Sequence, residues 1–579
     1  MIISNTDKNA LIIDDSSIML SSLRKMCIDL GFKDENIVLE KFPRAAVEKC
    51  SHTQFSLIIC DYNFNTRLNT HLNTRLNGRT IYDELKFKKV LSHDAAFIII
   101  TGEGTSKIVM SILELNPDEY YLKPFNAQFF INRTKVTIKR RKALSQLYEM
   151  LETENYANFD NTCNEIEFAY PEFYYQIQKL KGQLYSKQSL HEEALKVYNS
   201  VLALKKVEWA MIGSADSLLE LGDYEASNDI IKELLARPIK SSDVMSLAAK
   251  YDIFSTDVPT AIEHLSMANE IAPGNPDREF VIALLCISQQ DFRNAASRFT
   301  QYYELSLDTY RYSNNPRYYY LSCCLLELDS MSKQVFFNDN HDYREHMIFE
   351  QSMHNLENEV LSKFSALVND NSYNYHLPDT DVEKPNSYYG DLITIHISIR
   401  DMKLDYAIGL LRNTYNKFNF CNIEGTFHLI YLLDLLSFHK EFIIVRDKVL
   451  ESLKENKSIL DRARLEIIKN ISEMHIYKIT KTESLLESFN ERFNSGHYIQ
   501  LMEDLFKLKN INFHNKKVNY YIIKTLQHCW PKDFGKDKVY KLIQHCYSIC
   551  DKLMTKDEIE KTNLLEIYDN AIQLSDKMK

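Results

Sequence analysis

The stretch LIICDYNF, residues 57–64, decides the fold of the N-terminal part of this chain. Four apolar residues stand in a row before the acidic residue Asp61. A short, continuous apolar run of this kind is typical of a strand that is buried on both faces of a parallel sheet. Ligands of such sheets bind at the carboxyl ends of the strands, so Asp61 stands where a functional carboxylate is expected.

Four more apolar runs surround this stretch, and segments of helical length lie between them. The runs are residues 11–13, 37–39, 97–100 and 120–122, and the helical segments include residues 16–30 and 105–115. Strands that alternate with helices predict a parallel sheet covered on both faces. Right-handed crossovers then give a doubly wound α/β domain with five strands.

Polar residues follow four of the five predicted strands. They are Asp14 and Asp15 after the first, Asp61 after the third, Thr101 after the fourth and Lys123 after the fifth. Three carboxylates at one sheet edge repel one another, and a hard divalent cation such as Mg²⁺ relieves that repulsion. The set predicts phosphoryl transfer, with Asp61 as the nucleophile and with Lys123 and Thr101 contacting the transferred oxygens.

Four segments together resemble the receiver domain of two-component response regulators. They are LIIDDSSIM (11–19), LIICDYNF (57–64), IIITGEG (98–104) and EYYLKPF (119–125). The resemblance implies a flavodoxin-like fold over about residues 8–140, with Asp61 as the phosphoacceptor. It also implies a histidine kinase or a phosphotransfer protein as the phosphoryl donor.

The resemblance assigns roles to further residues. Asp14, Asp15 and Asp61 would bind Mg²⁺ together with the backbone carbonyl of Asn63. Tyr120 would be the aromatic switch residue, paired with Thr101 as the switch hydroxyl, and the Lys123–Pro124 peptide bond would be cis. Such a receiver catalyses only its own phosphorylation and dephosphorylation, so the chain is not expected to be an enzyme that acts on other substrates. Receiver-mediated homodimers are a further expectation.

A near-perfect four-residue repeat runs from Asn65 to Thr80, directly after the third strand. Two interpretations stay open. The repeat is a tandem duplication without a function of its own, because loops absorb insertions at low cost. Alternatively it is a basic flap over the site, since Arg67, His71, Arg75 and Arg79 recur every four residues and one helical face would present them together. Asn and Thr are poor helix formers, which weakens the second interpretation.

The segment 143–310 contains a periodic pattern. Small residues that are followed four positions later by a larger one begin at Ala194, Ser227, Ala261 and Ala295, at intervals of 33, 34 and 34 residues. The pattern resembles tetratricopeptide repeats (TPR), in which a small residue lets two helices approach closely and stacked helix pairs form a concave groove. It predicts an all-α, TPR-like solenoid that binds another protein.

Composition bounds the remaining possibilities. Only 13 glycines and 12 prolines occur in 579 residues, which favours helices, and the net charge of −11 argues against general nucleic-acid binding. The 11 cysteines form no disulfide framework and are typical of reduced cytosolic thiols. Zinc binding by the histidines and cysteines of 528–550 is disfavoured, because their spacing fits no common finger. No signal peptide and no apolar stretch long enough for a membrane helix is present.

The sequence therefore predicts a cytoplasmic response regulator of three parts: a receiver (1–142), TPR-like repeats (143–310) and a helical region (311–579) that continues the solenoid or forms a bundle. Phosphorylation of Asp61 would control protein binding by the helical output. Two alternatives stay open. One is a scaffold whose receiver only docks or dimerises, and the other is an unrecognised enzyme within residues 311–579.

Overall fold

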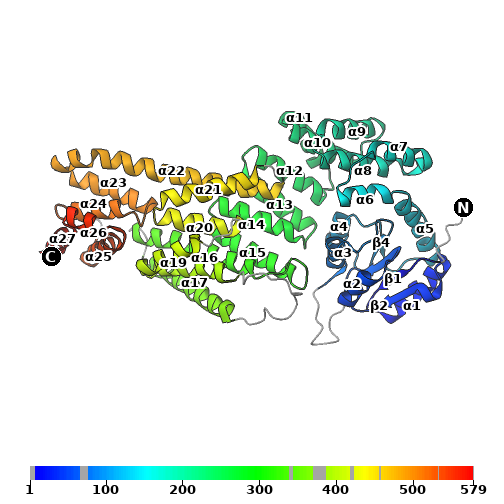
Figure 1. Cartoon of the computed structure of the whole chain (residues 1–579), viewed down its shortest axis with the longest axis horizontal. Coiled ribbons are helices and arrows are strands. Elements are labelled where there is room, and N and C mark those ends of the chain that lie inside the picture. The colour runs from blue at the N-terminus through cyan, green and yellow to red at the C-terminus, as the bar shows by residue number, and fades with distance from the viewer. Residues whose placement is uncertain are drawn as a thin grey trace. The chain divides into compact units, whose positions relative to one another are not determined.

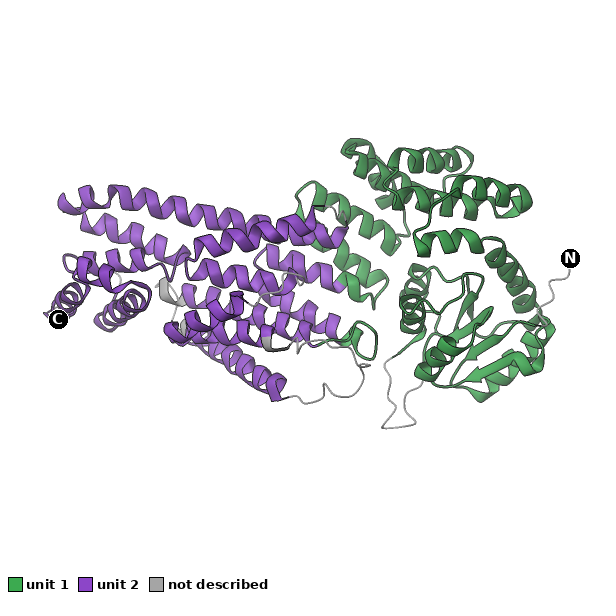
Figure 2. Ribbon diagram, viewed as in Figure 1, with its two compact units in different colours: residues 1–278, 304–313 green, residues 279–303, 314–579 purple. Residues whose placement is uncertain are grey.

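The computed structural model describes residues 7–64, 76–337, 343–369, 386–416, 423–454, 458–531 and 534–577 (Figure 1). The chain divides into two compact units (Figure 2). Unit 1 comprises residues 1–278 and 304–313, and unit 2 comprises residues 279–303 and 314–579. The three predicted domains, 1–142, 143–310 and 311–579, remain predictions.

Unit 1 begins with a five-stranded parallel sheet in the order β2-β1-β3-β4-β5. The strands are β1 (Ala10–Ile13), β2 (Ile37–Glu40), β3 (Leu57–Asp61), β4 (Ala96–Thr101) and β5 (Glu119–Leu122). Each predicted strand lies within one of them, so the doubly wound α/β fold is confirmed.

Helices cover both faces of this sheet, which explains why the central strands β1, β3 and β4 are buried along their whole length and consist mainly of apolar residues. Helices α1 (Ser17–Asp29) and α5 (Ala127–Ala143) pack on one face against residues such as Ile12 and Ile59. The other face carries α2 (Pro43–His52), α3 (Gly78–Phe87) and α4 (Ser106–Glu114). Because alternate residues of a strand point to opposite faces, a sheet covered twice leaves no face of a central strand for polar side chains.

The rest of unit 1 is helical. Its elements are α6 (Ser145–Thr153), α7 (Phe159–Ala169), α8 (Tyr174–Lys187), α9 (His191–Leu204), α10 (Glu208–Leu221), α11 (Tyr224–Leu235), α12 (Ser242–Phe254) and α13 (Val258–Ile271), with the 3-10 turn η3 (Pro171–Phe173). A further 3-10 turn, η1 (Asp34–Asn36), precedes β2 in the sheet. The pairs α8/α9, α10/α11 and α12/α13 pack side by side.

Small residues lie where these helices meet. Ala194, Ser227 and Ala261 are fully buried, as the periodic pattern predicts for close helix packing. A Cβ atom added at Gly182 would come within 2.5 Å of the Tyr198 ring, and one added at Gly213 within 2.4 Å. The helix pairs are therefore present at the predicted positions, whereas their membership of the TPR family stays a proposal.

The described residues of unit 2 form helices joined by connections, with no strand among them. Its elements are α14 (Pro276–Ser288, whose first turn belongs to unit 1), α15 (Phe292–Ser306), α16 (Asn315–Phe337), α17 (Tyr343–Asn369), α18 (Asn386–Arg400), α19 (Leu404–Asn416), α20 (Ile423–Leu435), α21 (His439–Leu453), α22 (Ile459–Asn494), α23 (Tyr498–Ile511), α24 (Lys516–Leu526), α25 (Lys536–Leu553), α26 (Lys556–Thr562) and α27 (Leu564–Lys577). Helices were predicted here without boundaries. Over the described part of the chain, none of them has the length and apolar character that a membrane span requires.

Candidate functional site

Three carboxylates meet at the carboxyl edge of the sheet. Asp14 and Asp15 follow β1 and Asp61 ends β3, and each offers an oxygen atom within 4.8 Å of the other two. Asp14 is fully buried and Asp61 is 7% exposed. Over the described residues this is the one group of three acidic, histidine or cysteine side chains close enough to hold a metal ion.

An ammonium group bridges the cluster. Lys123 Nζ donates to Asp14 Oδ2 at 2.9 Å and to Asp61 Oδ2 at 3.0 Å. The peptide bond between Lys123 and Pro124 is cis, the isomer that the resemblance implied. The Lys123 side chain thus contacts both of the buried acids with a single charge.

The charge of Asp61 is only partly compensated by its surroundings. Burial raises the pKa of Asp61 to about 6, the Asp14 carboxylate acts in the same direction, and the Lys123 ammonium acts against both. Burial works against the charge of Lys123, but its hydrogen bond to Asp14 and the charge of Asp61 raise the pKa of Lys123 above its ordinary value. The other Asp61 oxygen, Oδ1, accepts a hydrogen bond from the Tyr62 backbone at 2.9 Å.

The remaining predicted residues lie around this cluster. Thr101 is buried at the end of β4, and its hydroxyl oxygen accepts a hydrogen bond from the Glu103 backbone at 3.1 Å. Tyr120 is half-buried in β5 and packs on the core beneath α3 and α4. Asn63 is exposed two residues after Asp61. The roles assigned to these three residues stay predictions.

The donor set fits a hard divalent cation. Carboxylate oxygens are the ligands that Mg²⁺ prefers, and three of them meet here beside the Lys123 ammonium, which contacts Asp14 and Asp61. Asp14, Asp15 and Asp61 would hold the ion. No softer ligand such as an accessible thiolate competes, because the neighbouring Cys60 is buried and its pKa is raised well above the ordinary value by burial and by the adjacent carboxylates.

The four-residue repeat lies largely outside the described residues, which resume at Leu76. One part of the basic-flap hypothesis is wrong, because Arg79 is a buried residue in the first turn of α3. The helix starts there since Asn77 and Thr80 form a reciprocal cap: the Asn77 side chain accepts from the Thr80 backbone, and the Thr80 hydroxyl accepts from the Asn77 backbone. An Asn followed three residues later by Thr was a signal for this helix start.

Arg79 belongs instead to an ion-pair cluster that sequence reasoning missed. Its guanidinium lies 3.4 Å from the Glu114 carboxylate at the end of α4. The same carboxylate pairs with Arg278 and accepts a hydrogen bond from Asn275 at 2.7 Å. Ser111 of α4 donates to the carbonyl of Pro273 at 3.0 Å. The contacts with Pro273, Asn275 and Arg278 each join residues that are more than 160 positions apart in the sequence. They attach the receiver-like sheet to the helical part of unit 1.

A second contact of this kind involves α3. The rings of Phe87 and Tyr310 stack with their centroids 3.8 Å apart, and the Tyr310 backbone donates to the Glu84 carboxylate. Residues 304–313 therefore fold back on the receiver-like part of unit 1.

Solved structures of receiver domains resemble the N-terminal part of the chain. A CheY-like receiver domain protein from Methanospirillum hungatei JF-1 is 18% identical over 23% of this chain and 96% of its own, with a TM-score of 0.20. A response regulator receiver domain protein from Clostridium thermocellum is 23% identical over 24% of this chain and 98% of its own, also with a TM-score of 0.20. A two-component response regulator from Clostridium difficile is 19% identical over 23% of this chain and 97% of its own, with a TM-score of 0.19. No family model and no curated protein matches the chain.

The raised pKa of Asp61 would make Mg²⁺ binding at this cluster depend on pH. With a pKa of about 6, Asp61 is ionised near pH 7.5 and about nine-tenths protonated near pH 5. Because the ion binds the carboxylate and competes with the proton, we expect Mg²⁺ affinity to fall about tenfold over this range. Calorimetric titration of the full chain measures it. In Asp61→Asn, the Mg²⁺ affinity at neutral pH should be lower and should fall less steeply as the pH decreases. If the pH dependence of the variant equalled that of the wild type, Asp61 would not be a ligand of the ion.

Proposed function

We propose that this chain is a response regulator of a two-component phosphorelay, with Asp61 as the phosphoacceptor. The observation that supports it best is the bridge from Lys123 to both Asp61 and Asp14 beside a third acid, Asp15, at the carboxyl edge of the sheet. The donor would be the phosphohistidine of a histidine kinase or a phosphotransfer protein.

The proposed reaction is an in-line displacement at phosphorus. A carboxylate oxygen of Asp61 forms the new P–O bond while the P–N bond of the phosphohistidine breaks, and the departing imidazole retains the electron pair. A bound Mg²⁺ would neutralise charge on the phosphoryl oxygens. The Lys123 ammonium, 3.0 Å from Asp61 Oδ2, would pair with one of those oxygens, and the Thr101 hydroxyl would donate to another.

Phosphorylation would reach the helical part of unit 1 through α3 and α4. Gly78, the first residue of α3, donates its backbone N–H to the Tyr62 carbonyl at 2.8 Å, one residue after Asp61. The next residue, Arg79, pairs with Glu114, and Glu114 pairs with Arg278 beyond α13. We therefore place the switch in this chain of contacts: new charge at Asp61, with movement of Thr101 and Tyr120, biases the packing of α4 on α12 and α13.

The proposed output is protein binding by the helical pairs, which we interpret as TPR-like, in a cytoplasmic protein. The buried small residues Ala194, Ser227 and Ala261, spaced as in such repeats, favour this interpretation. The chain would then carry out no reaction beyond its own phosphorylation and dephosphorylation.

Intact mass after incubation with acetyl phosphate and Mg²⁺ tests the proposal. Wild-type protein should gain one phosphoryl group, and Asp61→Ala should gain none, because the substitution removes the proposed nucleophile. Chelation of Mg²⁺ should abolish the adduct in the wild type. An adduct of equal yield in Asp61→Ala would overturn the assignment of Asp61.

Hydrogen exchange then distinguishes a phosphorylation-controlled switch from a scaffold that does not respond to phosphorylation. A switch requires that the amides of α4 and α13 exchange at different rates with and without the phosphoryl group. A scaffold whose receiver only docks or dimerises would give equal rates and equal capture of partner proteins in both states. Asp61→Asn treated with the same phosphodonor is the matched control.

A further inference from the structure

Unit 2 contains a cavity that the phosphorelay does not use. It has a volume of about 310 Å³, at the lower end of small-molecule sites, and side chains from α14, α15, α16, α18, α20, α22 and α23 line it. Every lining residue belongs to unit 2. The cavity is therefore a property of the helical region alone.

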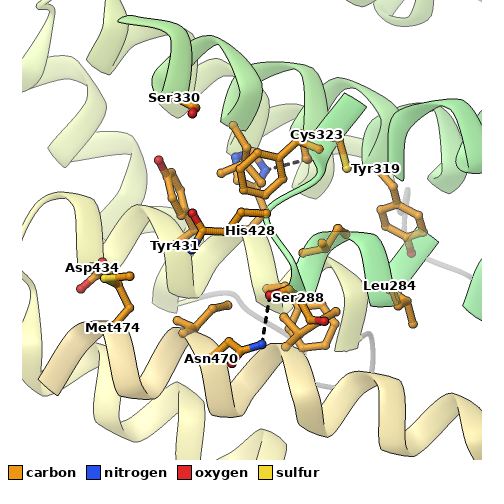
Figure 3. Close-up of a pocket in the computed structure, with 18 of the residues that line it drawn as sticks. Leu284, Ser288, Tyr319, Cys323, Ser330, His428, Tyr431, Asp434, Asn470 and Met474 are labelled. Carbon is orange, nitrogen blue, oxygen red and sulfur yellow. Dashed lines mark hydrogen bonds between the residues drawn. The ribbon is translucent and has the colours of Figure 1, made fainter. Parts of the chain in front are cut away.

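One part of the wall is apolar and aromatic. Figure 3 shows Leu284 and Tyr319 on one side of the cavity, and Phe299, Tyr389 and Phe427 also line it. The rings are held by one another: Tyr319 lies 5.3 Å from Phe299 and 5.8 Å from Tyr389 between centroids. A wall of fixed aromatic rings suits a flat apolar group.

The opposite side is polar, with Ser330, Tyr431 and Asp434 in view in Figure 3. Most of these groups are already paired. Tyr431 donates to Asp329 at 2.8 Å, Asp434 accepts from His475 at 2.6 Å, and Asp434 also pairs with Lys478. Paired groups of this kind shape a site but offer little to a ligand.

Two donors on this side differ from the rest. Ser330 and Lys333 stand three residues apart on α16, hence on one face of the helix, and both line the cavity. Within the described part of the chain, neither side chain has a hydrogen-bond or ion-pair partner. Burial and the nearby Lys478 ammonium lower the pKa of Lys333, against the pull of the Asp329 and Asp434 carboxylates.

The charges around Lys333 leave one positive charge in excess. Lys333, Lys478 and Arg400 face the two carboxylates Asp329 and Asp434, and Arg400 is bound to Asp329 at 2.8 Å. The more distant Glu357, 3.7 Å from Arg400, has a side chain that is 42% exposed and is screened by water. Glu424, the other carboxylate of the lining, is paired with Arg464.

His428, the histidine that lines the cavity, adds no charge to this count. Burial lowers the pKa of His428 well below its ordinary value, so its ring is neutral. It lies in a hydrogen-bonded series: Ser322 Oγ is 2.9 Å from His428, His428 is 2.9 Å from His396, and His396 is 3.0 Å from Asp329. Because this series is satisfied from end to end, it supports the wall.

We propose that unit 2 binds a small organic monoanion in this cavity, with a flat apolar body against the apolar part of the lining, such as Leu326 and Met474, and its carboxylate or sulfonate at Lys333. Ser330 donates a second hydrogen bond to the same anionic group. The cavity would give the helical region an input of its own, independent of Asp61. A half-buried ammonium without a hydrogen-bond partner is unfavourable beside an apolar wall, and the anion would supply that partner.

The fluorescent aromatic sulfonate 8-anilinonaphthalene-1-sulfonate is a suitable probe, since it combines both features. We expect saturable, one-to-one binding to the full chain, weakened about tenfold or more in Lys333→Met because a buried charge-assisted contact is lost. Lys333→Arg, which keeps the charge, should retain binding. Lys469→Met is the matched control, because Lys469 lies on α22, is 49% exposed and does not line the cavity.

Competition experiments distinguish the contribution of the anionic group to binding from that of the aromatic ring. 2-Naphthoate should displace the probe, and the uncharged 2-naphthol should do so about tenfold less well. Equal displacement by both, equal probe affinity in wild type and Lys333→Met, or no saturable binding would each overturn the proposal. Lys333→Arg is the control for a folding defect. If Lys333→Met loses its helical circular dichroism, the test uses Lys333→Arg alone. Retained probe binding in a folded Lys333→Arg variant supports the proposal, and loss of binding contradicts it. Asp61→Ala should bind the probe like the wild type.

Discussion

Glu114→Ala is expected to detach α4 from the helices that follow the receiver-like sheet. The Glu114 side chain is 9% exposed and stands between two guanidinium groups, those of Arg79 and Arg278, which are themselves 7% and 4% exposed. Removing the carboxylate leaves both cations buried without their anion. Breaking a buried pair in this way costs about 3–5 kcal/mol.

Hydrogen exchange of the full chain measures this loss where it occurs. We expect the amides of α4 and of the first turn of α14 to exchange about a hundredfold faster or more in Glu114→Ala, because the local opening free energy falls by that amount. Glu193→Ala is the matched control, since its pair with Lys196 in α9 is exposed to water and contributes little to stability. If both variants exchanged alike, the Glu114 cluster would not hold the two parts together.

The Glu114→Ala variant also tests the proposed switch. Signal transfer from Asp61 to α13 requires a contact that responds to both ends, and Glu114 is the residue that joins α3, α4 and α14. Phosphorylated Glu114→Ala should therefore show no further change in exchange over α13. A phosphorylation-dependent change that survived there would place the coupling elsewhere, for example in the stacked pair of Phe87 and Tyr310.

Local patterns predicted the strands and the residues at their ends. Each central strand is apolar without interruption because helices cover both faces, and strand order in a parallel sheet brings the strand ends to one edge. Asp14, Asp61 and Lys123 therefore meet as their positions in the sequence indicated. Ala194, Ser227 and Ala261 marked helix pairs for a related reason, since close packing of two helices needs a small residue.

Contacts between residues that are far apart in the sequence could not be predicted from local sequence patterns. Glu114 ends an amphipathic helix like many other glutamates, and nothing near it in the sequence indicates that Arg278, 164 residues later, is its partner. The cavity of unit 2 is also built from segments that are far apart, with Leu284, Lys333 and Asn470 on three different helices. The flap hypothesis wrongly included Arg79 because the four-residue repeat continues across the start of α3. The cap formed by Asn77 determines where this helix begins.

Gly78→Ala is expected to impair phosphorylation without touching any carboxylate. A Cβ atom at this position would lie 2.8 Å from the Asp61 carbonyl oxygen and 3.0 Å from the Tyr62 Cα atom. Both are backbone atoms at the end of β3, so relief requires the strand end or the start of α3 to move. The Asp61 carboxylate moves with that backbone, and its position relative to Lys123 changes.

Displacement of a nucleophile by a fraction of an ångström to about 1 Å lowers rates steeply, so we expect phosphorylation by acetyl phosphate to slow about ten- to a hundredfold. Gly104→Ala is the matched control, because it also lies beside the site, after β4, and a Cβ atom there meets nothing within 4 Å. Its rate should equal that of the wild type. Initial rates of adduct formation by intact mass, at saturating Mg²⁺, distinguish the two variants. A Gly78→Ala rate equal to that of Gly104→Ala would mean that the start of α3 adjusts without moving Asp61, and the path from Asp61 to Arg79 would then lose its first step.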